Sequence, residues 1–294
     1  MKIAFRSCVA ATAALACLIQ TNAGAPQSSP FHARQPADLA RAGYNTERDD
    51  PKEPTRRQSA EAQYNLGSLY DRGWGVPQDD AQSLYWFRKA ADQGNAPAQI
   101  KLGDRYQDQN WAARDDAQAV RWYRRAADQG FALARYRLGL MYATGRGVEQ
   151  DFAQAAVWYQ MAADQGLAIA QFDLGYMYLK GRGLEQDLSQ AISWYRKAAD
   201  QGWGDAQYSL ALIYQKGRGV QQDFVQALEW LILARASGVS RAEPKLEALA
   251  RHATATQLAE ARALADAKLG RATRASMPNV QTNPDLQFPL VGAP

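Results

Sequence analysis

The sequence predicts an all-α fold in which pairs of helices stack side by side as an α-solenoid. Three observations predict it: a 36-residue self-similarity, apolar residues spaced as on one face of a helix, and glycines and aspartates at regular helix boundaries. Repeats of this length cannot bury their apolar faces alone, so neighbouring copies must pack on each other. Five copies within residues 59–241 start at Ala62, Ala98, Ala134, Ala170 and Ala206.

The segment before the repeats has the pattern of an export signal. Residues 1–23 contain the basic residues Lys2 and Arg6, then an apolar run that ends at Ile19, then small residues. This pattern predicts a signal peptide cleaved after Ala23, and the apolar run is too short to span a bilayer. Nothing later in the chain resembles a membrane helix. Residues 24–58 are poor in large apolar residues and predict a flexible linker.

Cys17 follows Leu15 and Ala16, which raises the alternative of a lipid-anchored protein. We favour a soluble exported protein, because Ala14 occupies the position where a lipoprotein signal has a large aliphatic residue. Cys8 and Cys17 both lie in the signal peptide, so the mature chain has no cysteine nucleophile and no cysteine metal site. Cleavage changes the balance from 34 basic and 30 acidic residues to 32 and 30. A nearly neutral protein gives no support for a nucleic-acid partner.

The first half of each copy predicts a helix that lies very close to a neighbour. An alanine is followed four residues later by Leu-Gly and eight residues later by Tyr, which places the apolar residues on one helix face. Glycine inside a helix costs about 1 kcal/mol relative to alanine, so its recurrence predicts a close helix contact. The Leu-Gly and Tyr positions are Leu66-Gly67 and Tyr70, Leu102-Gly103 and Tyr106, Leu138-Gly139 and Tyr142, Leu174-Gly175 and Tyr178, and Leu210-Ala211 and Tyr214.

Two further patterns predict where the helices end and begin. Gly-x-Gly loops end the first helix, since glycine accepts the left-handed conformation of a helix C-terminus. An Asp-x-x-Gln pattern predicts a reciprocal capping box at the start of each second helix. The loop arginines Arg146, Arg182 and Arg218 are predicted to be solvated turn residues. The capping aspartates are Asp79, Asp115, Asp151, Asp187 and Asp223.

Each second helix carries a tryptophan followed four residues later by alanine, a large ring opposite a small residue. We interpret this stripe as core packing rather than as a ligand cage, because it recurs so regularly. The tryptophans are Trp86, Trp122, Trp158, Trp194 and Trp230.

Two copies depart from the pattern. Copy two replaces the glycine loop by residues 107–114, which indicates a longer first helix or a different loop. Copy five ends in the more apolar residues 231–238, which predicts packing against the segment that follows. Residues 242–270 are predicted to form a capping helix pair with a second capping box at Thr254 and Gln257, and residues 271–294 a disordered tail.

The repeats resemble Sel-one-like repeats, which are relatives of the tetratricopeptide repeat with a longer loop between the helices. The resemblance covers residues 60–240 and rests on Ala-x-x-x-Leu-Gly-x-x-Tyr, the Gly-x-Gly loop and the ending Trp-Tyr-x-x-Ala-Ala-Asp-Gln-Gly. It implies a right-handed superhelix that acts as an adaptor between other proteins. Some bacterial members are cysteine-rich secreted proteins with reported penicillin binding. This chain lacks their cysteines, so that property is not carried over.

Alignment with tetratricopeptide geometry predicts which residues of the first helices face the inner groove. The groove is expected to be polar near copies one and two and apolar near copies three to five. The column Asn65, Lys101, Arg137, Asp173 and Ser209 is expected to face solvent. Packing of the apolar groove residues between adjacent repeats is the equal alternative. The candidate groove residues are Leu140, Tyr176, Leu179 and Leu212, rimmed by Lys180 and Lys216, with Asp104 and Asp108 in the polar part.

No motif for catalysis or metal binding accompanies the repeats. His32 and His252 both lie outside them, and no paired carboxylates are marked for acid-base work. We therefore expect no catalytic residue, no metal and no cofactor. The sequence favours a non-enzymatic periplasmic adaptor that binds a protein or peptide. The alternative is an envelope enzyme or cell-wall-binding protein that uses Asp104, Asp108 and Arg137.

Overall fold

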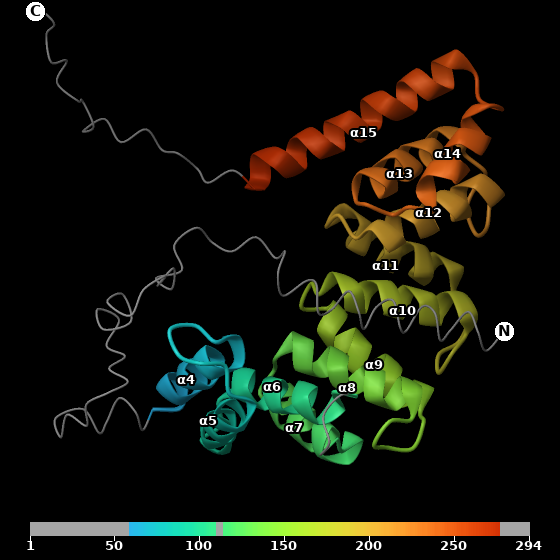
Figure 1. The fold of residues 1–294 in the computed structure, drawn as a ribbon. Coiled ribbons are helices and arrows are strands. Elements are labelled where there is room, and N and C mark those ends of the chain that lie inside the picture. The colour runs from blue at the N-terminus through green and yellow to red at the C-terminus, as the bar shows by residue number, and fades with distance from the viewer. Residues whose placement is uncertain (1–58, 110–113, 277–294) are drawn as a thin grey trace, which may run out of the picture. The chain divides into compact units, whose positions relative to one another are not determined.

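The structure is a computed structural model that describes residues 59–109 and 114–276 (Figure 1). These residues form twelve α-helices and no strand, in five consecutive helix pairs followed by two further helices. The chain is therefore an all-α solenoid, as the sequence predicts. The predicted signal peptide, the linker and residues 277–294 lie outside the described residues.

Each repeat contains a first and a second helix, and the first helix begins two residues before the recurrent alanine. The first helices are α4 (Ala60–Arg72), α6 (Ala96–Gln107), α8 (Ala132–Thr144), α10 (Ala168–Lys180) and α12 (Gly204–Lys216). The second helices are α5 (Asp80–Asp92), α7 (Asp116–Asp128), α9 (Phe152–Ala163), α11 (Leu188–Asp200) and α13 (Phe224–Ala236).

Two compact units make up the chain, one that ends at Asp187 and one that starts at Leu188. In the first unit each helix from α4 to α9 packs on the next helix along the chain. In the second unit α11 packs on α12 and α12 on α13, and α13 also contacts the two C-terminal helices. Each unit therefore has the neighbour-on-neighbour packing of a repeat protein.

The recurrent glycine of the first helix lies against an aromatic ring of the second helix. A Cβ atom on Gly103 would lie 2.4 Å from Cε1 of Tyr123, and one on Gly139 would lie 2.7 Å from Cδ1 of Tyr159. The close approach predicted from the Leu-Gly pair is therefore confirmed. In the fifth repeat Ala211 replaces the glycine and Leu231 replaces the aromatic residue. The methyl group of the alanine is therefore accompanied by a smaller side chain on the second helix.

Glycine ends the first helices in the way that the sequence predicts. Gly73, Gly145, Gly181 and Gly217 adopt left-handed backbone conformations at the C-caps. The second glycine of the loop has another role, because a Cβ on Gly147 would lie 2.2 Å from the carbonyl oxygen of Asp116. That glycine therefore lets the loop contact the start of the preceding second helix.

Only half of the predicted capping box forms at the second helices. The side chains of Asp79, Asp115, Asp151 and Asp223 accept backbone N–H groups of the first turn, as predicted. The backbone N–H of each of these residues, and of Asp187, instead donates to the carbonyl oxygen of the recurrent tyrosine of the same repeat. The loop folds back and places the aspartate N–H against a carbonyl oxygen of the first helix, which takes the place of the glutamine acceptor.

The tryptophans are less uniformly buried than predicted. Trp122, Trp194 and Trp230 are buried, whereas Trp86 and Trp158 are half-buried. The alanines one turn later are fully buried in all five repeats: Ala90, Ala126, Ala162, Ala198 and Ala234. The stripe therefore belongs to the core, with its outer edge reaching the surface in repeats one and three.

Buried glutamines join successive repeats. The Gln99 side chain donates to the carbonyl oxygen of Ala91 at 3.0 Å, and Gln171 and Gln207 make the same bond to Ala163 and Ala199. These bonds occupy carbonyl groups at the ends of second helices, which would otherwise be buried without partners. The sequence signal for them is the glutamine that follows the recurrent alanine in four of the five copies.

The C-terminal helices are α14 (Ala242–Ala250) and α15 (Ala255–Ser276). Both halves of the capping box predicted at Thr254 and Gln257 form, at 2.9 and 3.2 Å. Helix α15 extends to Ser276, past residue 271, where the predicted disordered tail starts. Alanine and arginine are strong helix formers, and a helix that has started extends readily. Packing of these helices on α13 confirms the role expected for the apolar end of copy five.

Candidate functional site on the first-helix face

The residues predicted to line the groove differ in how far they are exposed. Leu140 is only 7% exposed, so for this residue the alternative of packing between helices holds. The reason is that α8 packs on both α7 and α9, which buries most of its side chains. The remaining residues are accessible to different degrees: Tyr176, Leu179, Asp104 and Asp108 are half-buried and Lys180 is exposed, and in the second unit Leu212 is half-buried and Lys216 exposed.

Tyr176 is the centre of the accessible part of this face in the first unit. The Nζ atom of Lys180 lies 5.9 Å from the centroid of the Tyr176 ring, and the guanidinium of Arg182 lies at the same distance. Arg182 also lies 5.5 Å from the ring of Phe152, so it is not the solvated turn residue that the sequence predicts. An aromatic ring between two cations can bind an apolar side chain together with a neighbouring carboxylate.

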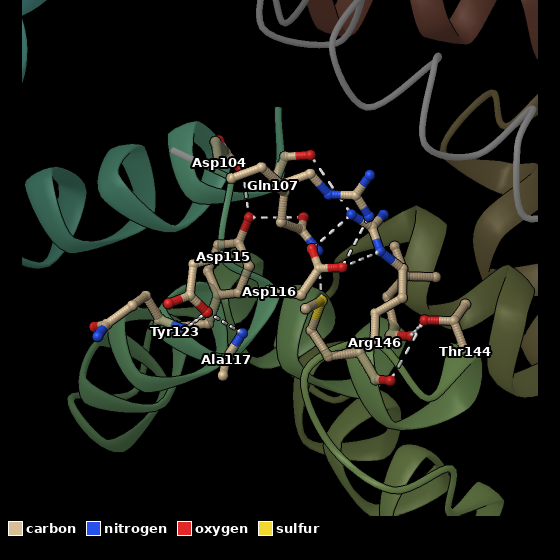
Figure 2. A network of polar contacts seen from close by, with 12 residues as sticks. Asp104, Gln107, Asp115, Asp116, Ala117, Tyr123, Thr144 and Arg146 are labelled. Carbon is tan, nitrogen blue, oxygen red and sulfur yellow. Dashed lines mark hydrogen bonds and ion pairs between the residues drawn. The ribbon is translucent and has the colours of Figure 1, made fainter. Parts of the chain in front are cut away.

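A polar network underlies the other part of the face, in repeats two and three (Figure 2). The Tyr123 hydroxyl donates to Asp104 at 2.6 Å and lies 3.0 Å from Oε1 of Gln107. Arg137 Nε lies 3.3 Å from the Asp104 carboxylate. Burial raises the pKa of the Tyr123 hydroxyl well above its ordinary value, and the nearby Asp104 charge raises it further, against the opposing charge of Arg137. Tyr123 therefore remains a hydrogen-bond donor at neutral pH.

Two residues of the column expected to face solvent, Arg137 and Asp173, make polar contacts with other repeats. Arg137 is only 8% exposed, so the expectation is wrong for this residue. In the fourth repeat Asp173 accepts a hydrogen bond from the buried Tyr136 hydroxyl at 3.1 Å. Arg137 is directed toward the protein and away from solvent because its guanidinium forms an ion pair with Asp104 of the preceding repeat.

Arg146 is also a structural residue rather than a solvated one. Its guanidinium makes two hydrogen bonds to the Asp116 carboxylate, at 2.7 and 3.2 Å, and Arg114 adds another at 2.9 Å (Figure 2). Burial raises the pKa of Asp116, but the hydrogen bonds and charges of Arg146 and Arg114 outweigh it, so the pKa lies below its ordinary value. Arg218 is exposed, as predicted. The three loop arginines thus have three different environments.

The family model described as the Sel1 repeat matches five consecutive segments of the chain. They are residues 60–95, 96–131, 132–167, 168–203 and 204–239. The chain belongs to the Sel1 repeat family. Sel1 repeat proteins are generally protein-interaction scaffolds and are typically not enzymes. No curated protein matches the chain.

Two solved structures are similar to this Sel1 repeat chain. One is c5321, described as a protective antigen of uropathogenic Escherichia coli strains that displays an SLR fold, with 32% identity and a TM-score of 0.67. That similarity covers 76% of this chain and 50% of c5321, so the chain matches only half the length of that relative. The other is a Sel1 repeat protein from Oxalobacter formigenes, with 33% identity and a TM-score of 0.63, covering 69% of this chain and 84% of that chain.

The Sel1 repeats of this chain contain polar contacts that sequence reasoning missed. Tyr123 was not recognised as a partner of the groove residue Asp104, nor Tyr136 as a partner of Asp173, which was expected to face solvent. No sequence signal marked Tyr123 as a partner of Asp104, because a tyrosine also follows the recurrent tryptophan in copies three and four, where the groove position is Leu140 or Tyr176. Nor did any signal link Arg146 to Asp116, because that contact joins the loop of one repeat to the helix of another.

Among residues 59–109 and 114–276 no cluster of three or more His, Cys, Asp or Glu side chains is arranged to hold a metal ion. In the same part of the chain no helix is long and apolar enough to cross a membrane.

Proposed function

We propose that this protein is an exported adaptor that binds a protein or peptide of the cell envelope through its first-helix face. The observation that carries the proposal is the accessibility of Tyr176, Leu179 and Lys180 on a repeat whose recurrent Leu174 and Trp194 are buried. These three positions also differ from copy to copy, whereas the scaffold positions repeat. Variable side chains on a constant frame are what a selective binding surface requires.

The chemistry of this surface favours an extended or helical segment with apolar and acidic side chains. Tyr176 and Leu179 offer apolar area, and Lys180 and Arg182 lie beside the Tyr176 ring. Aromatic residues and arginine are typical of the residues that contribute most to protein interfaces. Lys180 and Arg182 would favour a partner whose acidic residues lie next to the apolar side chain that contacts Tyr176.

The alternative, an envelope enzyme or cell-wall-binding protein, would use Asp104, Asp108 and Arg137. The contacts of the described residues weigh against it. Asp104 and Arg137 neutralise each other, and Arg137 is buried, so neither offers a free charge to a glycan.

Crosslinking and pull-down from an envelope extract test the proposal. We expect one protein to be enriched by the mature chain and lost with Tyr176→Ala and Leu179→Asp, by about ten-fold or more for residues that anchor an interface. Gln82→Ala, at an exposed position of a second helix, is the matched control and should retain the partner. Leu140→Asp is unsuitable, because it would place a charge in the core.

Saturable binding to purified cell wall without a protein partner, or turnover of that material, would support the alternative and overturn the adaptor. Export is tested separately by N-terminal sequencing of the protein from a periplasmic fraction. A mature chain that starts at Gly24 is expected, and a full-length chain confined to the cytoplasm would overturn this part of the proposal.

A further inference from the structure

The second helices have an outer face that carries the residue directly before each recurrent tryptophan. In repeats one to four this residue is exposed, whereas in repeat five it is Glu229, which is only 2% exposed. The difference arises because α15 packs on α13 (Figure 1). The five outer-face residues are Tyr85, Arg121, Val157, Ser193 and Glu229.

The contact between α15 and α13 shows how this outer face accepts a helix. Ala261 and Ala265, one turn apart on α15, are fully buried, so small side chains allow the close approach. One turn later Lys268 pairs with Glu229 at 2.9 Å. The Nζ atom of Lys268 also lies 3.6 Å from the centroid of the Trp230 ring.

The cation above the tryptophan is a feature of nearly every repeat. In repeats one, two and four it comes from the residue three positions after the tryptophan, at 5.4, 4.6 and 3.6 Å from the ring. These residues are Lys89, Arg125 and Lys197. Repeat five has Leu233 at this position, and Lys268 of the docked helix supplies the cation instead.

Repeat three, like repeat five, has no lysine or arginine three positions after its tryptophan. Among the described residues, however, no helix covers its outer face. Its second helix, α9, contains no charged residue, and Met161 stands where the cation is expected. Val157 is 53% exposed, the largest exposed fraction among the exposed large apolar residues of the described chain. Arg124 reaches only to 6.0 Å from the Trp158 ring and donates to the Tyr142 hydroxyl.

We propose that the outer face of α9, formed by Val157, Trp158 and Met161, is a docking surface for an amphipathic helix of a partner protein. The partner helix has small residues four positions apart and a lysine or arginine about one turn later, which completes the cation–π contact on Trp158. The face of the Trp158 ring favours such a cation, because the guanidinium of Arg124 lies 6.0 Å from it and is bonded to the Tyr142 hydroxyl instead. This surface lies on a second helix, so the inference is independent of the proposed function.

The test uses a labelled synthetic peptide of residues 254–276, because α15 has the required chemistry. Fluorescence anisotropy with the full-length protein should show saturable binding, and Val157→Asp should weaken it by about ten-fold or more. Met161→Lys, which supplies the cation from α9 itself, should weaken it several-fold. Ser193→Asp, at the matched exposed position of repeat four, should leave it unchanged, and a peptide with Ala261→Leu and Ala265→Leu should not bind.

Circular dichroism melting verifies that each variant remains folded. Val157→Asp is expected to fold because Val157 is exposed. Absence of saturable binding, or equal effects of Val157→Asp and Ser193→Asp, would overturn the proposal. Binding that responds to Glu229→Gln and not to Val157→Asp would place the peptide on α13 and would also overturn it. A dimer in sedimentation experiments that Val157→Asp dissociates would identify a second copy as the occupant, against the partner proposed.

Discussion

Gly67 of α4 lies directly against the ring of Phe87 on α5, so that a Cβ atom on Gly67 would be 2.7 Å from Cδ1 of Phe87. This distance is shorter than a carbon–carbon contact allows, so the absence of a side chain is required by the packing. The equivalent residues of repeat five, Ala211 and Leu231, show how the same contact is built with a smaller neighbour.

Gly67→Ala should destabilise the protein by about 1–2 kcal/mol, because the clash with Phe87 outweighs the gain in helix propensity. Phe87→Leu in the same chain should recover more than half of this loss, since the pair then matches Ala211 and Leu231. Urea unfolding of both single variants and the double variant gives the coupling between the two sites. Purely additive effects would show that the ring does not require the glycine.

Tyr123→Phe should cost about 1–2 kcal/mol of unfolding free energy, because the partly buried Asp104 loses its hydrogen-bond donor. The folded protein raises the pKa of Tyr123 above the ordinary value of 10.0, so this contribution is fully present below pH 10 and is lost as pH rises beyond it. The wild type should therefore lose more stability than the variant in alkaline urea titrations. Tyr85→Phe, at an exposed site, is the control and should change stability by less than about 0.5 kcal/mol.

Asp116→Asn should lower stability by about 1 kcal/mol at pH 7, because Arg146 and Arg114 lose their charged partner. The folded protein lowers the pKa of Asp116 below 3.8, so the contribution is present above that pH and is lost as pH falls through the folded value. Unfolding free energies of wild type and variant should converge between neutral and strongly acidic pH. Asp128→Asn, at an exposed position of the same helix, should show no such convergence.

Lys268→Met should lower the free energy required to detach α15 from α13 by about 3 kcal/mol, because Glu229 remains buried without its cation. Hydrogen exchange of α15 amides, followed by mass spectrometry, measures the change. Arg262→Met, at an exposed site on α15, should leave the exchange rates unchanged. The double variant Glu229→Leu/Lys268→Met should recover most of the protection, and failure to recover would show that the ion pair is not what holds the helix.

The repeat period, the helix pairs and their ends follow from the sequence alone. Gly145, Asp151 and Trp122 could be assigned to a cap, a start and a core position because local spacing determines these roles. Whether a first-helix residue is accessible depends instead on how neighbouring helices pack on one another. For that reason the sequence left open whether Leu140 is exposed or packed, and the expectation that Arg137 faces solvent is wrong.

The scaffold follows from the sequence, because hydrophobic periodicity and backbone capping are local properties of the chain. Which polar groups meet depends instead on the packing of helices in three dimensions. Tyr123 reaches Asp104 from another helix, and Arg146 reaches Asp116 from the next repeat. The physical reason is that these contacts satisfy buried charges and donors through distances set by helix packing, which no spacing along the chain records.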